Sequence, residues 1–206
     1  MRSLKINNMA MYKVGITGGI GSGKSVVCEL LQEQGVVVYN SDARAKSLMS
    51  SSKAIRNALV DAFGDDCFVG EELNRSFLAS KVFGNEAALQ QLNAIVHPAV
   101  REDFRRWAEE QSAPYVVLES AILFDSGFDG EVDTTLAVMA PMEERVRRCM
   151  ERDNASREAI LSRISHQMSD EELHGRAART IVNLRLDYLE EDIQQLHKIF
   201  CREASR

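Results

Sequence analysis

The sequence has little cysteine, and its cysteines are widely spaced. The four thiols form no C-x-x-C pair, and no histidine lies at zinc-ligand spacing from them. This argues against both a zinc site and a disulfide framework. We therefore expect free, mostly buried thiols in a reducing compartment, for which the cytoplasm is the expected location.

Long apolar runs and an excess of positive charge are also missing. No apolar run approaches the roughly 18 residues that a membrane span needs, and residues 1–11 lack the apolar core of a secretory signal. The formal net charge of −6 disfavours broad attraction to nucleic acid or to anionic membranes. We expect neither of these partners, no obligatory protein partner, and a locally built site for any phosphate. Residues 1–11 are expected to be an extension before the first strand.

The composition is that of a soluble globular protein. Hydrophobic residues make up 45% and charged residues 27% of the 206 positions, which fits one domain with insertions. Five short apolar runs have few alternating polar positions, as expected of parallel strands covered on both faces. These runs are Tyr12–Thr17, Val36–Tyr39, Tyr115–Ser120, Thr134–Met139 and Thr180–Leu184. Helical patterns separate them, so the sequence predicts an α/β three-layer sandwich with a five-stranded parallel sheet.

Two segments between the predicted strands are too long for simple crossovers. Residues 43–111 carry several amphipathic stretches and are expected to form a helical subdomain, in which His97 and Pro98 end one helix and start another. Residues 141–178 are rich in Arg and Glu, which predicts a solvated helical lid. The remaining core would consist of residues 12–42, 112–140 and 179–206.

The strongest motif is a phosphate-binding loop, GGIGSGKS at residues 18–25. It satisfies G-x-x-x-x-G-K-[ST] between a predicted strand and a predicted helix. Such a loop turns its backbone N–H groups around a polyphosphate, and the following helix adds the positive end of its dipole. Lys24 would reach the β- and γ-phosphates as a catalytic group, and the Ser25 hydroxyl would bind Mg²⁺. The expected nucleotide-binding residues are Gly19, Ile20, Gly21, Ser22, Gly23, Lys24, Ser25 and Val26. An N-K-x-D guanine-reading motif is absent, which argues against a GTPase.

Two carboxylates follow predicted strands and are candidates for the chemistry. Asp42 comes just after the second strand, at the edge where a parallel sheet lines its ligand crevice. It could accept the proton of an acceptor hydroxyl, or it could cap the next helix, a role that Ser41 could fill equally. Glu119 ends the third predicted strand, where it could hold Mg²⁺ through a water or satisfy the edge of the phosphate loop.

Arginines cluster in the predicted lid, where guanidinium groups could close over a transferring phosphoryl group. Acidic neighbours nearly balance them, so most of these arginines are expected to be surface residues. Arg152, at a predicted helix end, is the exception and the candidate catalytic arginine. In the helical subdomain, His97 and Arg101 are one helical turn apart and could bind an anionic substrate or form a structural joint.

Several segments occur in an order that resembles the dephospho-coenzyme A kinase family. They are VGITGGIGSGKS from Val14, NSDA from Asn40, LNRSFLASKVF from Leu73, LNAIVHPAVR from Leu92, AILFDSG from Ala121, RDN from Arg152 and ISHQMSDEE from Ile164. The resemblance runs from Tyr12 to the C-terminal helix. It implies a P-loop kinase core with a helical substrate-binding insertion for the coenzyme A moiety and a helical lid.

The resemblance also implies an activity, which is ATP-dependent phosphorylation of the ribose 3′-hydroxyl of dephospho-coenzyme A in the last step of coenzyme A biosynthesis. Asp42 matches the family's proposed base, whereas Asn40 stands where the family usually has a carboxylate. Asn183 matches the family's asparagine on the adenine side, although Leu184 follows it in place of a glycine. The alternatives are another small-molecule kinase for nucleosides or nucleotides, and a non-enzymatic ATP-sensing module.

Overall fold

Five parallel strands form the centre of the structure. The computed structural model describes residues 10–206, with the backbone alone at residues 186 and 187, so most of the predicted extension lies outside the described residues. The strand order is β2-β5-β1-β6-β7, and every neighbouring pair is parallel. The strands are β1 (Lys13–Thr17), β2 (Val37–Asn40), β5 (Val116–Glu119), β6 (Thr134–Met139) and β7 (Arg179–Val182). The predicted five-stranded parallel sheet is confirmed.

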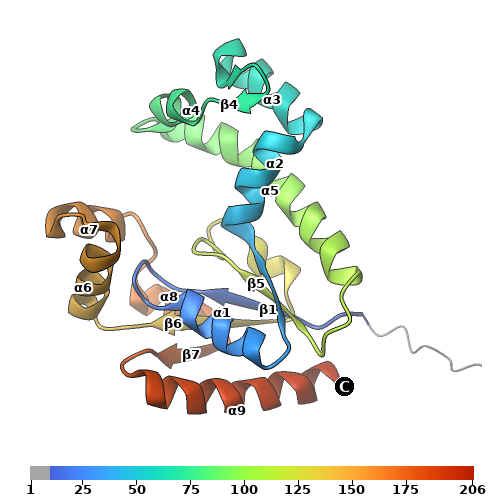
Figure 1. Ribbon diagram of the computed structural model, residues 1–206, viewed down its shortest axis with the longest axis vertical. Helices are drawn as coiled ribbons and strands as arrows, with labels where there is room; N and C mark the ends of the chain where they lie inside the picture. Colours follow the sequence, from blue (N-terminus) through green and yellow to red (C-terminus); the bar gives the residue numbers. More distant parts are fainter. Residues whose placement is uncertain (1–9) are drawn as a thin grey trace, which may run out of the picture.

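Helices cover both faces of this sheet (Figure 1). The helices of the described residues are α1 (Lys24–Glu33), α2 (Ser41–Ser51), α3 (Lys53–Phe63), α4 (Arg75–Val82), α5 (Glu86–Glu109), α6 (Met142–Asp153), α7 (Arg157–Ile164), α8 (Asp170–Arg176) and α9 (Leu186–Ala204). The side chain of Val117 packs with residues of α1 and α9, whereas its neighbours Val116 and Leu118 pack with residues of α5. Because alternate strand residues point to opposite faces, both layers are filled from one continuous apolar run.

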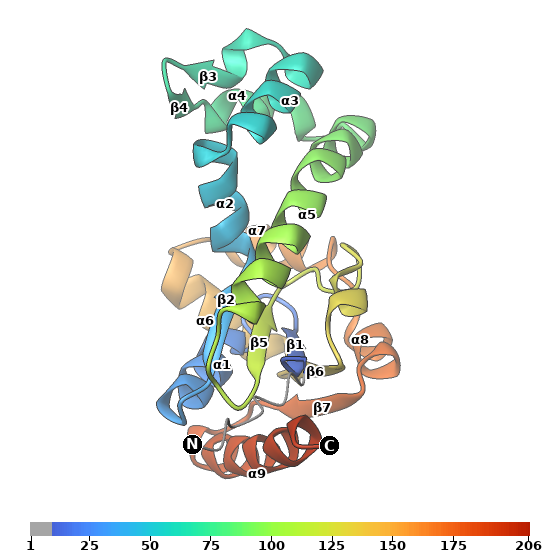
Figure 2. The same cartoon turned by 90° about the vertical axis from the view of Figure 1, so that its right-hand side faces the viewer.

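Helices α2 to α5 form an arm that extends away from the sheet, at the opposite end of the molecule from α9 (Figure 2). Its tip holds a short hairpin of β3 (Phe68–Val69) and β4 (Glu72–Leu73). The sequence did not predict this hairpin, because strands of two residues are too short to show a pattern. The tip has its own small core, which includes Ile55, Leu59 and Leu78.

The predicted helix boundary at His97 and Pro98 is wrong, because α5 continues through Pro98. A proline inside a helix costs about 3 kcal/mol, since it has no N–H to donate and its ring crowds the preceding turn. Val96, Val100 and Phe104 are nevertheless spaced four residues apart along one buried stripe. Burial of each large apolar side chain contributes about 1.5–3 kcal/mol, so an unbroken helix is favoured.

The lid segment, residues 141–178, contains α6, α7 and α8. Two helices follow Ser156, because α7 ends at Ile164 and a capping box starts α8. In this box the side chain of Ser169 accepts from the N–H of Glu172, and the side chain of Glu172 accepts from the N–H of Ser169. The segment is also less solvated than predicted, since it packs a small core of its own.

The four cysteines are free, and Cys28, Cys67 and Cys149 are buried while Cys201 is half-buried, as predicted. From residue 10 to the C-terminus, no helix combines the length and the apolar character that a membrane span requires.

A buried carboxylate anchors the base of the arm. Asp103 of α5 accepts a hydrogen bond from the Tyr39 hydroxyl at 2.6 Å and two from the Arg44 guanidinium at 2.9 and 2.7 Å. Burial alone would raise the pKa of Asp103, but these hydrogen bonds and the charges of Arg44 and Arg106 lower that pKa below its ordinary value. The contacts join β2, α2 and α5 at one point.

We predict that Asp103→Asn lowers the free energy of unfolding at pH 7 by about 1.5–3 kcal/mol, because it weakens hydrogen bonds to a charged group. The folded-state pKa of Asp103 lies below the ordinary value of 3.8, so its stabilisation is present above that pH and is lost as pH falls through the folded-state pKa. Urea unfolding of both proteins at several pH values should therefore show a difference that shrinks below pH 3.8. Asp129→Asn, which removes an exposed pair with Arg176 at 3.7 Å, is the control and should change stability by less than about 1 kcal/mol.

Candidate active site

The phosphate loop joins β1 to α1 and is built from backbone that favours glycine. Gly21 and Gly23 have φ values of 76° and 95°, in the left-handed region that other residues rarely adopt. A Cβ at Gly21 would lie 2.5 Å from the carbonyl oxygen of Arg145, and a Cβ at Gly23 would overlap the side-chain amide of Asn183. Backbone conformation and close packing therefore both require these glycines.

Lys24 lies over the loop, where its ammonium group donates to the carbonyl oxygen of Gly18 at 2.7 Å. Burial lowers the pKa of Lys24, while the carboxylates of Glu119 and Asp42 oppose that shift. Burial raises the pKa of Glu119, and Lys24 and the amide of Asn40 oppose this shift in turn. The two predicted carboxylates thus share one electrostatic environment with the predicted phosphate-binding lysine.

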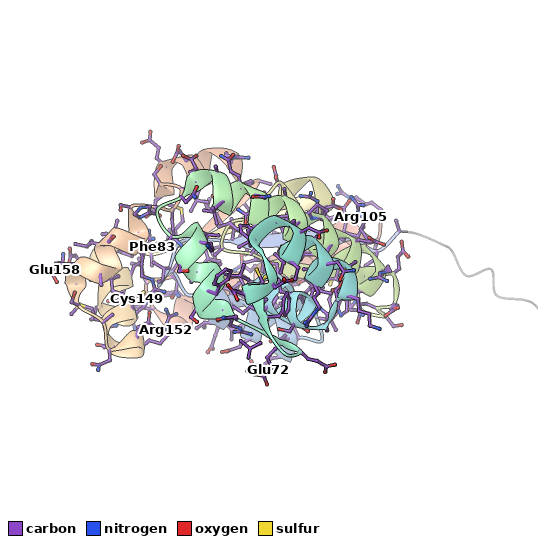
Figure 3. All side chains as sticks on the ribbon, turned by 90° about the horizontal axis from the view of Figure 1, so that it is seen from above. Glu72, Phe83, Arg105, Cys149, Arg152 and Glu158 are labelled. Atoms are coloured by element: carbon purple, nitrogen blue, oxygen red, sulfur yellow. The ribbon has the colours of Figure 1, made fainter. Side chains whose placement is uncertain are left out.

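A cleft of about 1130 Å³ brings most of the predicted site residues together. Its walls come from the phosphate loop, from the carboxyl ends of β2 and β5, from the lid segment and from the arm. Predicted site residues in this lining are Ile20, Gly21, Gly23, Lys24, Ser25, Val26, Asp42, Glu119 and Arg152. Figure 3 looks down on the arm and labels Phe83 at the arm tip and Arg152 on α6, which both line the cleft.

Asp42 lies in the first turn of α2 and does not cap that helix. The N-cap is Asn40, whose side-chain oxygen accepts from the N–H of Ala43 at 2.8 Å. The capping role considered for Asp42 and Ser41 is therefore wrong, and the Asp42 carboxylate is left facing the cleft. The sequence did not predict Asn40 as the cap, because Asn40 is both the last residue of strand β2 and the residue before α2, so no loop separates the two elements.

Asn40, which caps the helix that carries Asp42, also contacts Glu119. Its side-chain amide donates to Glu119 at 2.5 Å, and the parallel register places Asn40 opposite Glu119. Strand β5 lies between β1 and β2, so Glu119 lies between the phosphate loop and Asp42. One asparagine therefore fixes both the start of α2 and the orientation of Glu119.

A second, smaller cavity of about 280 Å³ lies between α2 and α5 and includes Asp42 in its lining. His97 lines it too, and burial, followed by the nearby charge of Arg101, lowers the pKa of His97. Arg101 points elsewhere, since it donates to the carbonyl oxygen of Ser126 at 2.9 Å and lies over the ring of Phe128. The structure thus places only one member of the predicted His97–Arg101 pair at a cavity.

The lid arginines differ sharply in their surroundings. Arg152 lines the cleft and is held there by the carboxylate of Asp153 at 2.7 Å, which also binds Arg163, another cleft residue, at 2.8 Å. Hydrogen bonds from Arg152 and Arg163 lower the pKa of Asp153 to about 2. Arg157 instead pairs with the exposed Glu143.

Arg145 and Arg148 belong to the lid arginines, most of which were expected on the surface, and neither of the two is an ordinary surface charge. Arg145 is only 2% exposed and donates to the carbonyl oxygen of Ile20 at 3.0 Å. Arg148 lines the cleft and donates to the carbonyl oxygen of Asn183 at 3.2 Å. The spacing of Arg145, Arg148 and Arg152 on one helix face could have indicated this.

Asn183 contacts the phosphate loop from behind. It is buried, and its amide donates to the carbonyl oxygen of Ser22 at 3.0 Å. This contact supports the loop backbone, and the predicted place of Asn183 on the adenine side stays a prediction. The residue was found from the resemblance, but its partner could not be read from the sequence.

The donor set at the loop suits a magnesium ion. Ser25 and Glu119 both line the cleft and offer a hydroxyl and a carboxylate oxygen, which are ligands that Mg²⁺ prefers. Among the side chains that the structure describes, no group of three or more His, Cys, Asp or Glu is placed to hold a metal. Mg²⁺ at such loops usually keeps waters and takes phosphate oxygens, so few protein ligands are needed.

Comparisons with known proteins agree on one family. The family model described as dephospho-CoA kinase matches residues 12–186. A dephospho-CoA kinase of Bacteroides fragilis (strain ATCC 25285) is 48% identical over 172 residues, which cover 83% of this chain and 84% of the relative. A crystal structure of a Thermus thermophilus protein has a TM-score of 0.80 at 37% identity and covers 92% of this chain and 97% of its own. A dephospho-CoA kinase from Campylobacter jejuni shares the fold, with a TM-score of 0.67 at 22% identity over 93% of this chain and 98% of its own.

We predict that Asn40→Ala removes the cap of α2 and costs about 1 kcal/mol of stability. Turnover should also fall, because the variant frees both the helix turn that carries Asp42 and the side chain of Glu119. Asn74→Ala is the matched control, since Asn74 caps α4 in the same way and lies outside the cleft lining. Urea unfolding and steady-state rates should show similar stability losses but a rate loss only for Asn40→Ala. Equal rates in the two variants would contradict this prediction.

Proposed function

Because the chain belongs to the dephospho-CoA kinase family, we propose that it transfers the γ-phosphoryl group of ATP to the ribose 3′-hydroxyl of dephospho-CoA, which yields coenzyme A and ADP. The observation that carries this proposal is the position of Asp42. Its side chain lines both the cleft at the phosphate loop and the cavity between α2 and α5. A carboxylate at the junction of two cavities can accept a hydrogen bond from the hydroxyl of a ligand in one cavity, at the place where that hydroxyl meets a phosphoryl group held in the other.

The phosphate loop and α1 would bind the triphosphate. N–H groups of the loop and the N-terminus of α1 stabilise negative charge without a counter-ion of their own. Lys24 would move from the carbonyl oxygen of Gly18 to the β- and γ-phosphates, whose charge compensates for the burial that lowers its pKa. Asn183 would keep the carbonyl oxygen of Ser22 turned away from the ligand.

Ser25 and Glu119 would hold Mg²⁺, Glu119 through a water. When bound, the ion would neutralise the negative charge that develops on the phosphoryl group during transfer. Burial raises the pKa of Glu119, and a cation beside the carboxylate would lower that pKa again. Asn40 would keep Glu119 aimed at the loop.

The arm cavity would hold the part of dephospho-CoA that surrounds the accepting hydroxyl. Met49, Val96 and Phe128 give the cavity apolar walls, and His97 gives it a polar group. Burial favours a neutral imidazole at His97, which can donate or accept a hydrogen bond. Arg101 would support the loop at Ser126 and so shape this cavity without contacting the substrate.

Asp42 would orient the acceptor hydroxyl and take its proton during transfer, and Arg152 would stabilise the transferring group from the lid. Lid closure would exclude water, because water competes with the hydroxyl as phosphoryl acceptor.

The cytoplasmic location and the expected lack of nucleic-acid, membrane and protein partners stay predictions. So does the division of the chain into core, substrate-binding insertion and lid.

The proposal is tested by measuring ADP release with ATP and dephospho-CoA, against a panel of nucleosides and nucleoside monophosphates. Lys24→Ala should lower the rate by at least about 10²-fold, because Lys24 stabilises transition-state charge. Its melting temperature should stay near that of the wild type, since Lys24 supports no core packing. Lys53→Ala, an exposed lysine at the start of α3, should be normal. Turnover that is faster with a nucleoside than with dephospho-CoA would favour the alternative kinase, and no turnover with any acceptor would favour an ATP sensor.

The role of Asp42 gives a separate prediction. Asp42→Asn should reduce turnover by about 10²- to 10⁴-fold, because the amide cannot accept a proton. Stability should change little, since Asn40 provides the cap. Rates are measured at saturating ATP and dephospho-CoA, with Asp61→Asn, exposed on α3, as the control. Near-normal turnover of Asp42→Asn would mean that the proton leaves by way of solvent, late in a loose transition state.

The lid arginines give a third comparison. Arg152→Ala should lower kcat by at least about tenfold, because its guanidinium lies in the cleft. Arg157→Ala removes a salt bridge of similar kind from the exposed side of the lid and should leave kcat within a factor of about two. Small and equal effects in steady-state assays would show that both arginines are surface charges.

A further inference from the structure

One residue of the phosphate loop, Ile20, is held by the lid segment through its whole backbone. Its N–H donates to the side-chain oxygen of Gln167 at 2.8 Å. Its carbonyl oxygen accepts from Nε of Arg145 at 3.0 Å. Gln167 and Arg145 are 22 positions apart in the sequence and reach opposite sides of the same loop residue. The roles given to Lys24, Asp42 and Arg152 use neither contact.

Arg145 is itself fixed, so the contact is not that of a mobile surface arginine. It is buried, and its second nitrogen pairs with Asp170 of α8 at 2.8 Å. The capping box of Ser169 and Glu172 starts α8 at Asp170. The segment QMSDEE, residues 167–172, thus supplies one direct contact to Ile20 and one contact through Arg145.

Packing completes the attachment. The side chain of Ile20 joins the small core of Val146, Cys149 and Ile160, which belong to α6 and α7. On either side of it, Gly19 and Gly21 lie against Arg145 so closely that neither has room for a Cβ. The lid segment therefore covers one side of the loop, and its Gln167 lines the cleft beside Ile20.

We propose that Gln167 and Arg145 are positioning residues for the nucleotide: by holding both peptide groups of Ile20, they keep the loop in its phosphate-binding shape before a nucleotide arrives. This inference rests on the proposed nucleotide site at the loop. A loop that is already ordered loses less conformational entropy on binding, so its N–H groups bind phosphate more tightly. The same contacts make the base of the lid and the phosphate loop one mechanical unit.

The proposal makes a prediction about affinity that differs from that for a direct contact with the γ-phosphate, which only ATP carries. Gln167→Ala should weaken binding of ADP and of ATP by the same factor, about 3- to 10-fold, the range expected for one lost hydrogen bond. The KM for ATP should rise correspondingly, whereas kcat and the KM for dephospho-CoA at saturating ATP should stay within about twofold. Dissociation constants are measured by calorimetry on the full chain with Mg²⁺ present. Gln195→Ala, exposed on α9, is the control.

A second variant separates action through Ile20 from independent effects. Asp170→Asn releases one side of Arg145 and should also weaken ADP binding. Because Gln167 and Asp170 both act through Ile20, the double variant should lose less affinity than the product of the two single losses. If Gln167→Ala does not fold, Gln167→Asn, which is one methylene shorter, replaces it in the cycle.

Three results would overturn the proposal. They are an unchanged ADP dissociation constant in a folded Gln167 variant, losses that multiply fully in the double variant, and a loss confined to ATP. A wild-type chain that binds ADP but does not phosphorylate dephospho-CoA would overturn the proposed function and leave the proposal on Ile20 in place.

Discussion

The site depends on a constraint of parallel sheets, which is that all strands end at the same edge. Register places Ile16 of β1, Glu119 of β5 and Asn40 of β2 side by side, at the carboxyl ends of three adjacent strands. The phosphate loop leaves the first of these ends, and α2 with Asp42 leaves the last. Glu119 is thereby aligned with two residues that are each more than 75 positions away in the sequence, and no loop has to reach over the sheet.

Both long insertions depend on that same edge. The arm begins directly after β2, and its base is fixed by the contacts of Tyr39 and Arg44 with Asp103. The lid segment begins after β6 and is fixed by the contacts of Arg145 and Gln167 with Ile20. Each insertion is thus secured near the cleft by hydrogen bonds to a fixed element, while Phe83 at the arm tip is 90% exposed. This arrangement fixes the base of each insertion at the edge of the sheet where the cleft lies.

Local patterns predicted the sheet and the phosphate loop because each depends on a short stretch of sequence. The five apolar runs and the GGIGSGKS motif needed no information about distant residues. Pro98, Asn40 and Arg145 were misjudged for the opposite reason. Whether Pro98 interrupts a helix depends on what Val96 and Phe104 bury, and whether Arg145 is exposed depends on Ile20 and Asp170, which are far away in the sequence.

The burial of Arg145 also changes how the loop glycines are understood. A glycine in a phosphate loop is ordinarily explained by the ligand, because only glycine lets backbone N–H groups approach phosphate closely. Here Gly19 and Gly21 are required from the outer side as well, where the backbone and guanidinium of Arg145 leave no room for a Cβ. Since desolvating an arginine is costly unless its donors are satisfied, the carbonyl oxygen of Ile20 and the carboxylate of Asp170 are needed to keep it there. The loop is therefore shaped by two surfaces at once, and a substitution on either side of it changes the same backbone.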